Sequence, residues 1–185
     1  EGHHLEDSAT SLFRQQLSAR SIRRAVSPLL ISKKKPGALE QIAHHHLSEN
    51  SLLPDDRKSK ALQLVDELEL LGPRAFEDSE LWFQEMHNTL LPDVESTKRL
   101  KPEFTLDQLW KSSTKGILDN AIQKLGRLSD RMIRLEDILD ELPENLRIQH
   151  PQPLLDLARC RRRIVNQASF LQQFAGIAPP TSTPE

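Results

Sequence analysis

The stretch ILDNAIQKLGRLSDRMIRLEDILDEL, residues 117 to 142, decides the fold, because its apolar residues recur at alternating intervals of three and four. This spacing is the heptad signature of a helix that packs along its length against other helices. We assign Leu118 to heptad position a, and every a and d position is then apolar as far as Leu142. The resulting seam consists of Leu118, Ala121, Leu125, Leu128, Met132, Leu135, Leu139 and Leu142.

The apolar stripe of this helix is broader than a two-stranded coiled coil requires. Ile117 and Ile138 occupy g positions and Ile122 occupies an e position, beside the a and d seam. A stripe of this width suits a helix that packs among two or more others, in the ridge geometry of helix bundles.

The helix that carries the seam is long for a chain of 185 residues. No proline interrupts residues 106 to 142, and Pro143 ends the segment. At 1.5 Å per residue this helix is about 55 Å long, more than the diameter of a compact domain of this size. We therefore expect one end to project and to pair with another chain. The alternative is that other apolar stripes of the same chain cover the seam.

The other apolar residues also follow helical spacing, in shorter segments. The stripe in residues 55 to 71 is followed by Gly72 and Pro73, which together predict a helix end. A second short helix is predicted over residues 78 to 90, and a last helix from Pro153 to Gly176. No segment has the alternation of a strand. The sequence predicts an all-α fold, an elongated helical bundle with a long C-terminal coiled-coil-like helix hairpin.

We predict two structural parts and a tail. Residues 8 to 91 form an N-terminal bundle of short helices, and residues 105 to 176 form the long helix with an antiparallel C-terminal helix. Residues 177 to 185 are rich in Pro, Thr and Ser, a composition typical of a linker.

Composition limits the classes of function. The net charge of −2 gives no overall field that would draw the protein onto nucleic acid or a membrane. No apolar run approaches the roughly 18 residues that a membrane span needs. The single cysteine, Cys160, fits a reducing compartment. We expect an intracellular protein, nuclear or cytoplasmic, without membrane contact.

No pattern of catalytic or cofactor-binding residues is present in the sequence. The chain has no phosphate-binding glycine loop, dinucleotide fingerprint, nucleophile elbow or zinc-protease motif. His44, His45 and His46 are consecutive, and neighbours on a helix diverge by about 100°, so the three cannot share one metal ion. We expect no enzymatic activity, no cofactor and no metal.

Two groups of residues are candidates for binding other protein subunits. The first is the heptad seam, through which the helix of residues 117 to 142 would form a hetero- or homo-oligomer. The second is an arginine cluster on the last helix, whose guanidinium groups spread round the helix so that some must meet acid or phosphate. Nucleic acid would require more basic surface and stacking aromatic residues. The predicted partner-binding residues are Leu118, Leu125, Leu128, Met132, Leu135, Leu139, Arg161, Arg162 and Arg163.

Ser27 is a candidate phosphorylation site. Arg23 and Arg24 precede it and Pro28 follows it, so the segment resembles sites of both basophilic and proline-directed kinases. A phosphate here would add about two negative charges beside basic residues and would change which partner the segment meets.

One segment resembles a known family. DDRKSKALQLVDELELLGPRAFE, residues 55 to 77, resembles the closing helices of caspase-recruitment domains, in which a Leu-rich helix is followed by Gly, Pro, a basic residue, Ala and Phe. The resemblance implies a compact six-helix death-fold unit around residues 10 to 92. It also implies an adaptor role in apoptosis or innate immunity.

The leading hypothesis from the sequence is a non-enzymatic assembly or scaffold subunit. It would bind partner proteins through the heptad-patterned helix within a multi-protein complex. Two alternatives remain open at this stage, a death-fold-type adaptor and a nucleic-acid-associated regulatory domain.

Overall fold

The computed structural model describes residues 18–30, 35–49, 51–90 and 114–175, and within them it contains six helices and no strand. The all-α prediction is therefore confirmed for this part of the chain. The helices are α2 (Ala19–Val26), α3 (Ala38–His46), α4 (Asp55–Leu90), α6 (Thr114–Leu139), α7 (Glu144–Gln149) and α8 (Pro151–Ala175).

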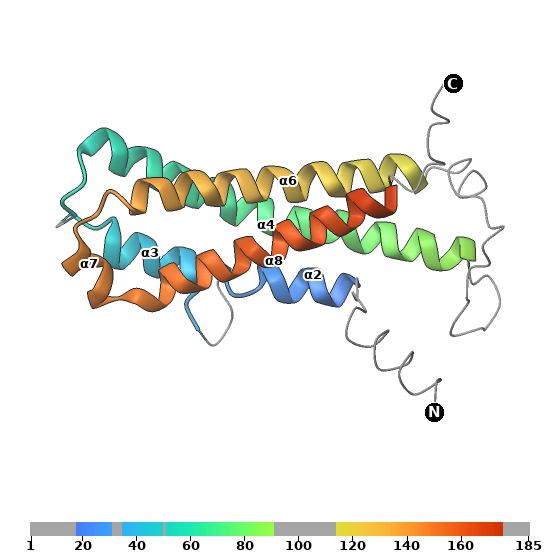
Figure 1. The fold of residues 1–185 in the computed structure, drawn as a ribbon, viewed down its shortest axis with the longest axis horizontal. Coiled ribbons are helices and arrows are strands. Elements are labelled where there is room, and N and C mark those ends of the chain that lie inside the picture. The colour runs from blue at the N-terminus through green and yellow to red at the C-terminus, as the bar shows by residue number, and fades with distance from the viewer. Residues whose placement is uncertain (1–17, 31–34, 50, 91–113, 176–185) are drawn as a thin grey trace, which may run out of the picture.

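Three long helices lie side by side and give the molecule its elongated shape (Figure 1). Helix α8 runs antiparallel to α6, to which it is joined through the short helix α7, and α4 packs along α6. The short helices α2 and α3 pack against both α4 and α8. That α6 and α8 wind round each other as a coiled coil stays a prediction.

Helices α4 and α6 are antiparallel, and three ion pairs mark their register. Arg57 pairs with Glu141, just beyond the end of α6, at 2.9 Å between Nη2 and Oε1. Further along α4, Glu67 pairs with Arg131, and then Asp78 pairs with Lys124. The residue numbers of the three α4 partners rise along this series, while those of the residues that they pair with fall, as antiparallel helices require. Each of these partly exposed pairs is worth about 0 to 1 kcal/mol, so they specify alignment more than stability.

The heptad seam of α6, together with Leu142 just beyond the helix, is buried. Its eight side chains are at most 2% exposed, and all of them except Ala121 belong to the same core cluster as residues from the other helices, such as Ile22, Leu68 and Leu157. Ile138, one of the flanking positions that broaden the stripe, is also buried. The two parts predicted for residues 8 to 91 and 105 to 176 share this one core.

The prediction that the seam meets another chain needs correction. In this fold α4 and α8 pack along α6, and the side chains of Leu118, Leu125, Leu128, Met132, Leu135 and Leu139 are buried, so they are not available to a partner. The expectation of a projecting end assumed that only short helices accompany the long one. In fact α4 has 36 residues, about 54 Å, against 26 residues for α6.

The predicted helix end at Gly72 and Pro73 is wrong, because α4 continues through both residues. Pro73 has no N–H for the carbonyl of Glu69, but the ring lies on the exposed side of α4, where water can satisfy that carbonyl. Leu68 and Ala75, on either side of the proline, are fully buried. Packing on both sides thus outweighs the local preference for a helix end.

Gly72 serves the packing of α2 rather than the termination of α4. A Cβ atom at this position would lie 3.1 Å from Cγ1 of Val26 and 3.3 Å from Cδ2 of Leu30. The absence of a side chain therefore lets the end of α2 approach α4 closely. The stretch from 55 to 77, which resembles two consecutive helices of caspase-recruitment domains, lies within the single helix α4.

Replacement of Pro73 by alanine tests the continuity of α4. We expect Pro73→Ala to raise the free energy of unfolding by about 1 to 3 kcal/mol, because it restores a helical hydrogen bond and removes a steric clash inside a helix. The gain is partly reduced by the greater freedom of the unfolded chain. Denaturant titration followed by circular dichroism measures the change. An unchanged or lower stability would indicate that the helix ends at this position.

Candidate protein-interaction face

The three predicted arginines differ in their surroundings. Arg161 turns toward α6, where its Nε donates a hydrogen bond to Oε2 of Glu136 at 2.6 Å. Arg162 and Arg163 are exposed, and neither forms an ion pair within the part of the chain that the structure describes. Of the nine predicted partner-binding residues, these two are the ones that lie free on the surface.

Arg163 and two arginines of α2 line one hollow between α2 and α8, with a volume of about 470 Å³. Arg20 and Arg24 are four residues apart on α2 and so lie on the same side of that helix. The other described residues of the lining are polar and uncharged, and none of the described lining residues is acidic or aromatic. We call this surface the arginine hollow; its lining residues are Ser18, Arg20, Ser21, Arg24, Arg163 and Gln167.

Local hydrogen bonds fix the α2 side of the arginine hollow. Ser18 caps the start of α2, because its Oγ accepts a hydrogen bond from the backbone N–H of Ser21 at 3.1 Å. Oγ of Ser21 in turn accepts from the N–H of Ser18 at 3.0 Å, which completes a capping box. The Ser21 hydroxyl also lies 3.0 Å from Oε1 of Gln167 and so links α2 to α8.

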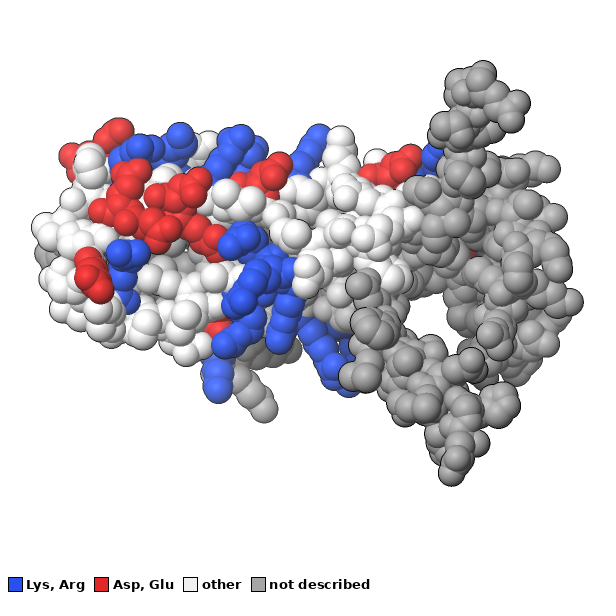
Figure 2. Space-filling view, viewed as in Figure 1, with Lys and Arg blue, Asp and Glu red and all other residues white. Residues whose placement is uncertain are grey.

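Arginine is the only charged residue type in the two segments around the hollow, although Arg159 pairs with Asp156, just before the second segment, and Arg161 pairs with Glu136. Residues 18–30 and 157–175 together contain seven arginines, with neither lysine nor any acidic residue. Figure 2 shows the corresponding basic side chains gathered over the middle of α8 and over α2, with acidic side chains grouped toward the C-terminal end of α6. A protein with a net charge of −2 therefore carries a local excess of positive charge on this face.

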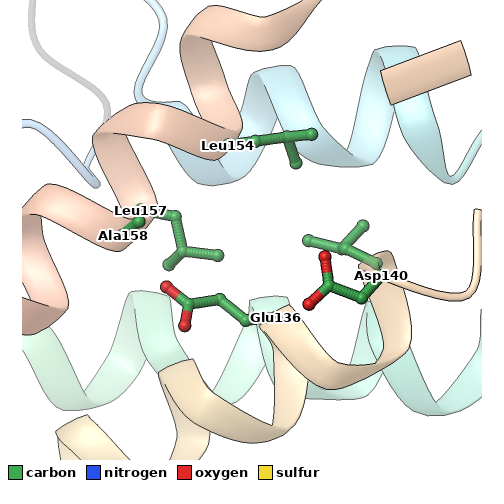
Figure 3. A pocket seen from close by; sticks show the side chains of 6 residues that line it. Glu136, Asp140, Leu154, Leu157 and Ala158 are labelled. Carbon is green, nitrogen blue, oxygen red and sulfur yellow. The ribbon is translucent and has the colours of Figure 1, made fainter. Parts of the chain in front are cut away.

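A smaller pocket of opposite character lies between the end of α6 and the start of α8, with a volume of about 200 Å³ (Figure 3). The carboxylates of Glu136 and Asp140 stand at its edge, and aliphatic side chains such as Leu154 and Leu157 form its walls. Burial raises the pKa of Glu136, and the hydrogen bond from Arg161 partly offsets that rise. The sequence does not predict this acidic pocket, because its residues come from two helices whose contact no local pattern displays.

The histidines of α3 meet a fourth histidine that is distant in the sequence. The ring of His45 stacks on that of His150 with centroids 4.1 Å apart, and Nε2 of His46 lies 3.0 Å from the carbonyl oxygen of His150. Among the residues that the structure describes, no group of three or more His, Cys, Asp or Glu side chains is arranged to hold a metal ion. This cluster therefore joins α3 to the turn between α7 and α8.

The pKa of His45 and that of His46 are both lowered. Desolvation by burial is the largest cause for each, followed for His45 by repulsion from the neighbouring histidines. For His46 the hydrogen bond to the carbonyl of His150 acts in the opposite direction. The folded protein thus favours the neutral form of both rings.

These shifts predict that stability falls on mild acidification. A histidine with a lowered pKa in the folded state stabilises the fold above the unfolded pKa of about 6.5, and this contribution is lost as the pH falls through the folded pKa. Urea midpoints measured between pH 7.5 and pH 5.5 should therefore decrease. A His45→Gln, His46→Gln double variant should show a shallower pH dependence over that window, and an unchanged slope would contradict this assignment.

The single cysteine, Cys160, does not lie on the surface. Cys160 is buried in α8, and burial raises the pKa of its thiol to about 11, so the thiolate is scarce at neutral pH.

Ser27, the candidate phosphorylation site, is exposed and forms the C-cap of α2. Arg23, one turn before it, lies over the ring of Phe76 with 5.4 Å between Cζ and the ring centroid. Whether Ser27 is modified stays a prediction.

No protein-family model, no curated protein and no solved structure matches this chain. None of the described helices combines the length and the hydrophobicity needed to span a membrane.

Proposed function

We propose that this chain is a non-enzymatic helical subunit that binds an acidic segment of a partner protein, within a multi-protein complex. The binding surface is the face of α2 and α8 around the arginine hollow. The proposal rests on one group of exposed arginines from both helices. They are Arg20, Arg24, Arg162 and Arg163, and the segments that contain them, residues 18–30 and 157–175, have no acidic residue.

The choice of arginine over lysine supports an acidic protein partner. The planar guanidinium group binds carboxylates and phosphates through two parallel hydrogen bonds, whereas lysine acts as a point charge. Both segments of this face contain arginine as their only basic residue. Complementary charge of this kind favours rapid and selective encounter with an oppositely charged partner.

Two further observations favour a protein partner over nucleic acid or a substrate. The acidic pocket near the start of α8 would repel a phosphate backbone that continued along the helix, and the arginine hollow has no aromatic residue for base stacking. Among the described residues that line the acidic pocket and the arginine hollow, no hydroxyl or thiol is paired with a histidine or carboxylate, as nucleophilic catalysis requires. Intracellular location, in nucleus or cytoplasm, is part of the same proposal and rests on the single cysteine.

Binding of a labelled peptide rich in glutamate tests the proposal. In fluorescence anisotropy at low salt, we expect the peptide to bind the full chain and to dissociate as the salt concentration rises. The double variant Arg162→Glu, Arg163→Glu should weaken binding by about tenfold or more, because attraction at two sites becomes repulsion.

The matched control reverses two exposed arginines on another face. Arg127 and Arg134 lie on the outer side of α6, and Arg127→Glu with Arg134→Glu changes the net charge by the same amount. This variant should retain most of the binding. Equal losses in both variants would indicate a response to net charge alone. Tighter binding of a DNA duplex than of the acidic peptide would favour the nucleic-acid alternative.

A further inference from the structure

We infer that the arginine hollow is a binding site for a phosphoryl group, presented on a phosphorylated serine or threonine of the acidic partner segment. This inference rests on the proposed function, since the partner supplies the phosphorylated residue. It concerns one site on the α2–α8 face and the chemistry of the group that fills it.

The donors around the hollow converge from two helices. Arg20 and Arg24 project from successive turns of α2, about 6 Å apart along its axis, and Arg163 projects from α8 on the other side. The contact between Ser21 and Gln167 holds these two walls together. Three guanidinium groups around one concavity offer more N–H donors than a single carboxylate can accept, and this number suits the three oxygens of a phosphoryl group.

The start of α2 adds further positive potential. The N–H groups of Ala19 and Arg20, in the first turn of the helix, have no acceptor within α2, as is usual for the start of a helix. The helix dipole places partial positive charge at the same end. A dianion in the hollow would therefore interact with fixed backbone charge as well as with the arginine side chains. By comparison, the neighbouring Arg162 does not line the hollow and offers a single exposed guanidinium group.

The charge of the ligand is indicated by what the hollow lacks. None of the described residues that line it is acidic, so the three arginines repel one another until an anion enters. A phosphoryl group carries about −1.5 to −2 charges at neutral pH, compared with −1 for a carboxylate, and relieves more of this repulsion. The volume of about 470 Å³ leaves room for the residue that carries the phosphate.

Two acidic peptides that differ only in one phosphate test the inference. Each carries a central serine flanked by glutamates, phosphorylated in one peptide and free in the other. We expect the full chain to bind the phosphorylated peptide about tenfold or more tightly at fixed low salt. The variant Arg24→Gln, Arg163→Gln should abolish this preference, because both residues line the hollow.

The chain provides a matched control, since each of these arginines has a neighbour that does not line the hollow. Arg23→Gln with Arg162→Gln removes the same charge from the same two helices. It should weaken both peptides while preserving the preference for phosphate. An equal loss of preference in both double variants would overturn the site assignment.

Inorganic phosphate gives a second readout that does not depend on a peptide. In amide NMR spectra, millimolar phosphate should shift the signals of Ala19, Arg20 and Ser21 more than those of the α6 arginines. Shifts confined to other parts of the surface would contradict the site. Equal affinity for the two peptides overturns this inference alone, whereas no binding of either peptide overturns the proposed function as well.

Discussion

The burial of the apolar seam of α6 within its own chain is the constraint on which the rest of the structure depends. Seven apolar side chains along one helix must be removed from water, and burial of apolar surface is the main favourable contribution to folding. Only long neighbours can cover a seam of this length. The chain provides one in α4, which continues through Pro73 because packing on both sides of the proline offsets its local cost.

Because helices of the same chain bury the seam, a partner can bind only to the outer surfaces of the helices. Basic and acidic side chains between α4 and the α6 region are paired with one another, and Arg161 is paired with Glu136. By contrast, the arginines that line the hollow between α2 and α8 form no ion pair within the part of the chain that the structure describes. An interaction surface of this kind depends on charge and hydrogen bonding more than on apolar contact.

Much of the fold could be predicted from the sequence, because helical periodicity is a local property. The heptad spacing identified the helix from 117 onward, but α6 ends at Leu139, three residues before the end that Pro143 predicts. The width of the stripe at Ile117 and Ile122 indicated several helical neighbours, as the structure has. The end predicted at Pro73 failed, because the packing that overrides a proline involves α2 and α6, which no local pattern displays. Residues 106–113 of the predicted long helix lie outside the described residues.

The site was predictable only in part. The arginine cluster on the last helix was visible in the sequence, but its division into the paired Arg161 and the free Arg162 and Arg163 depends on a contact with Glu136. Arg20 and Arg24 join Arg163 across more than a hundred residues of chain. One signal could have pointed to them: the segments around all three contain arginine and no acidic residue.

Circular dichroism and light scattering of two aspartate variants on α6 test most directly whether the seam is internal. Leu125 is fully buried, whereas Ile133, on the same helix, is 40% exposed. An internal seam predicts a monomeric parent that loses its helical signal in Leu125→Asp, since a buried unpaired charge costs several kcal/mol, and keeps it in Ile133→Asp. A Leu125→Asp protein that stayed folded and lost only an oligomeric state would contradict the account.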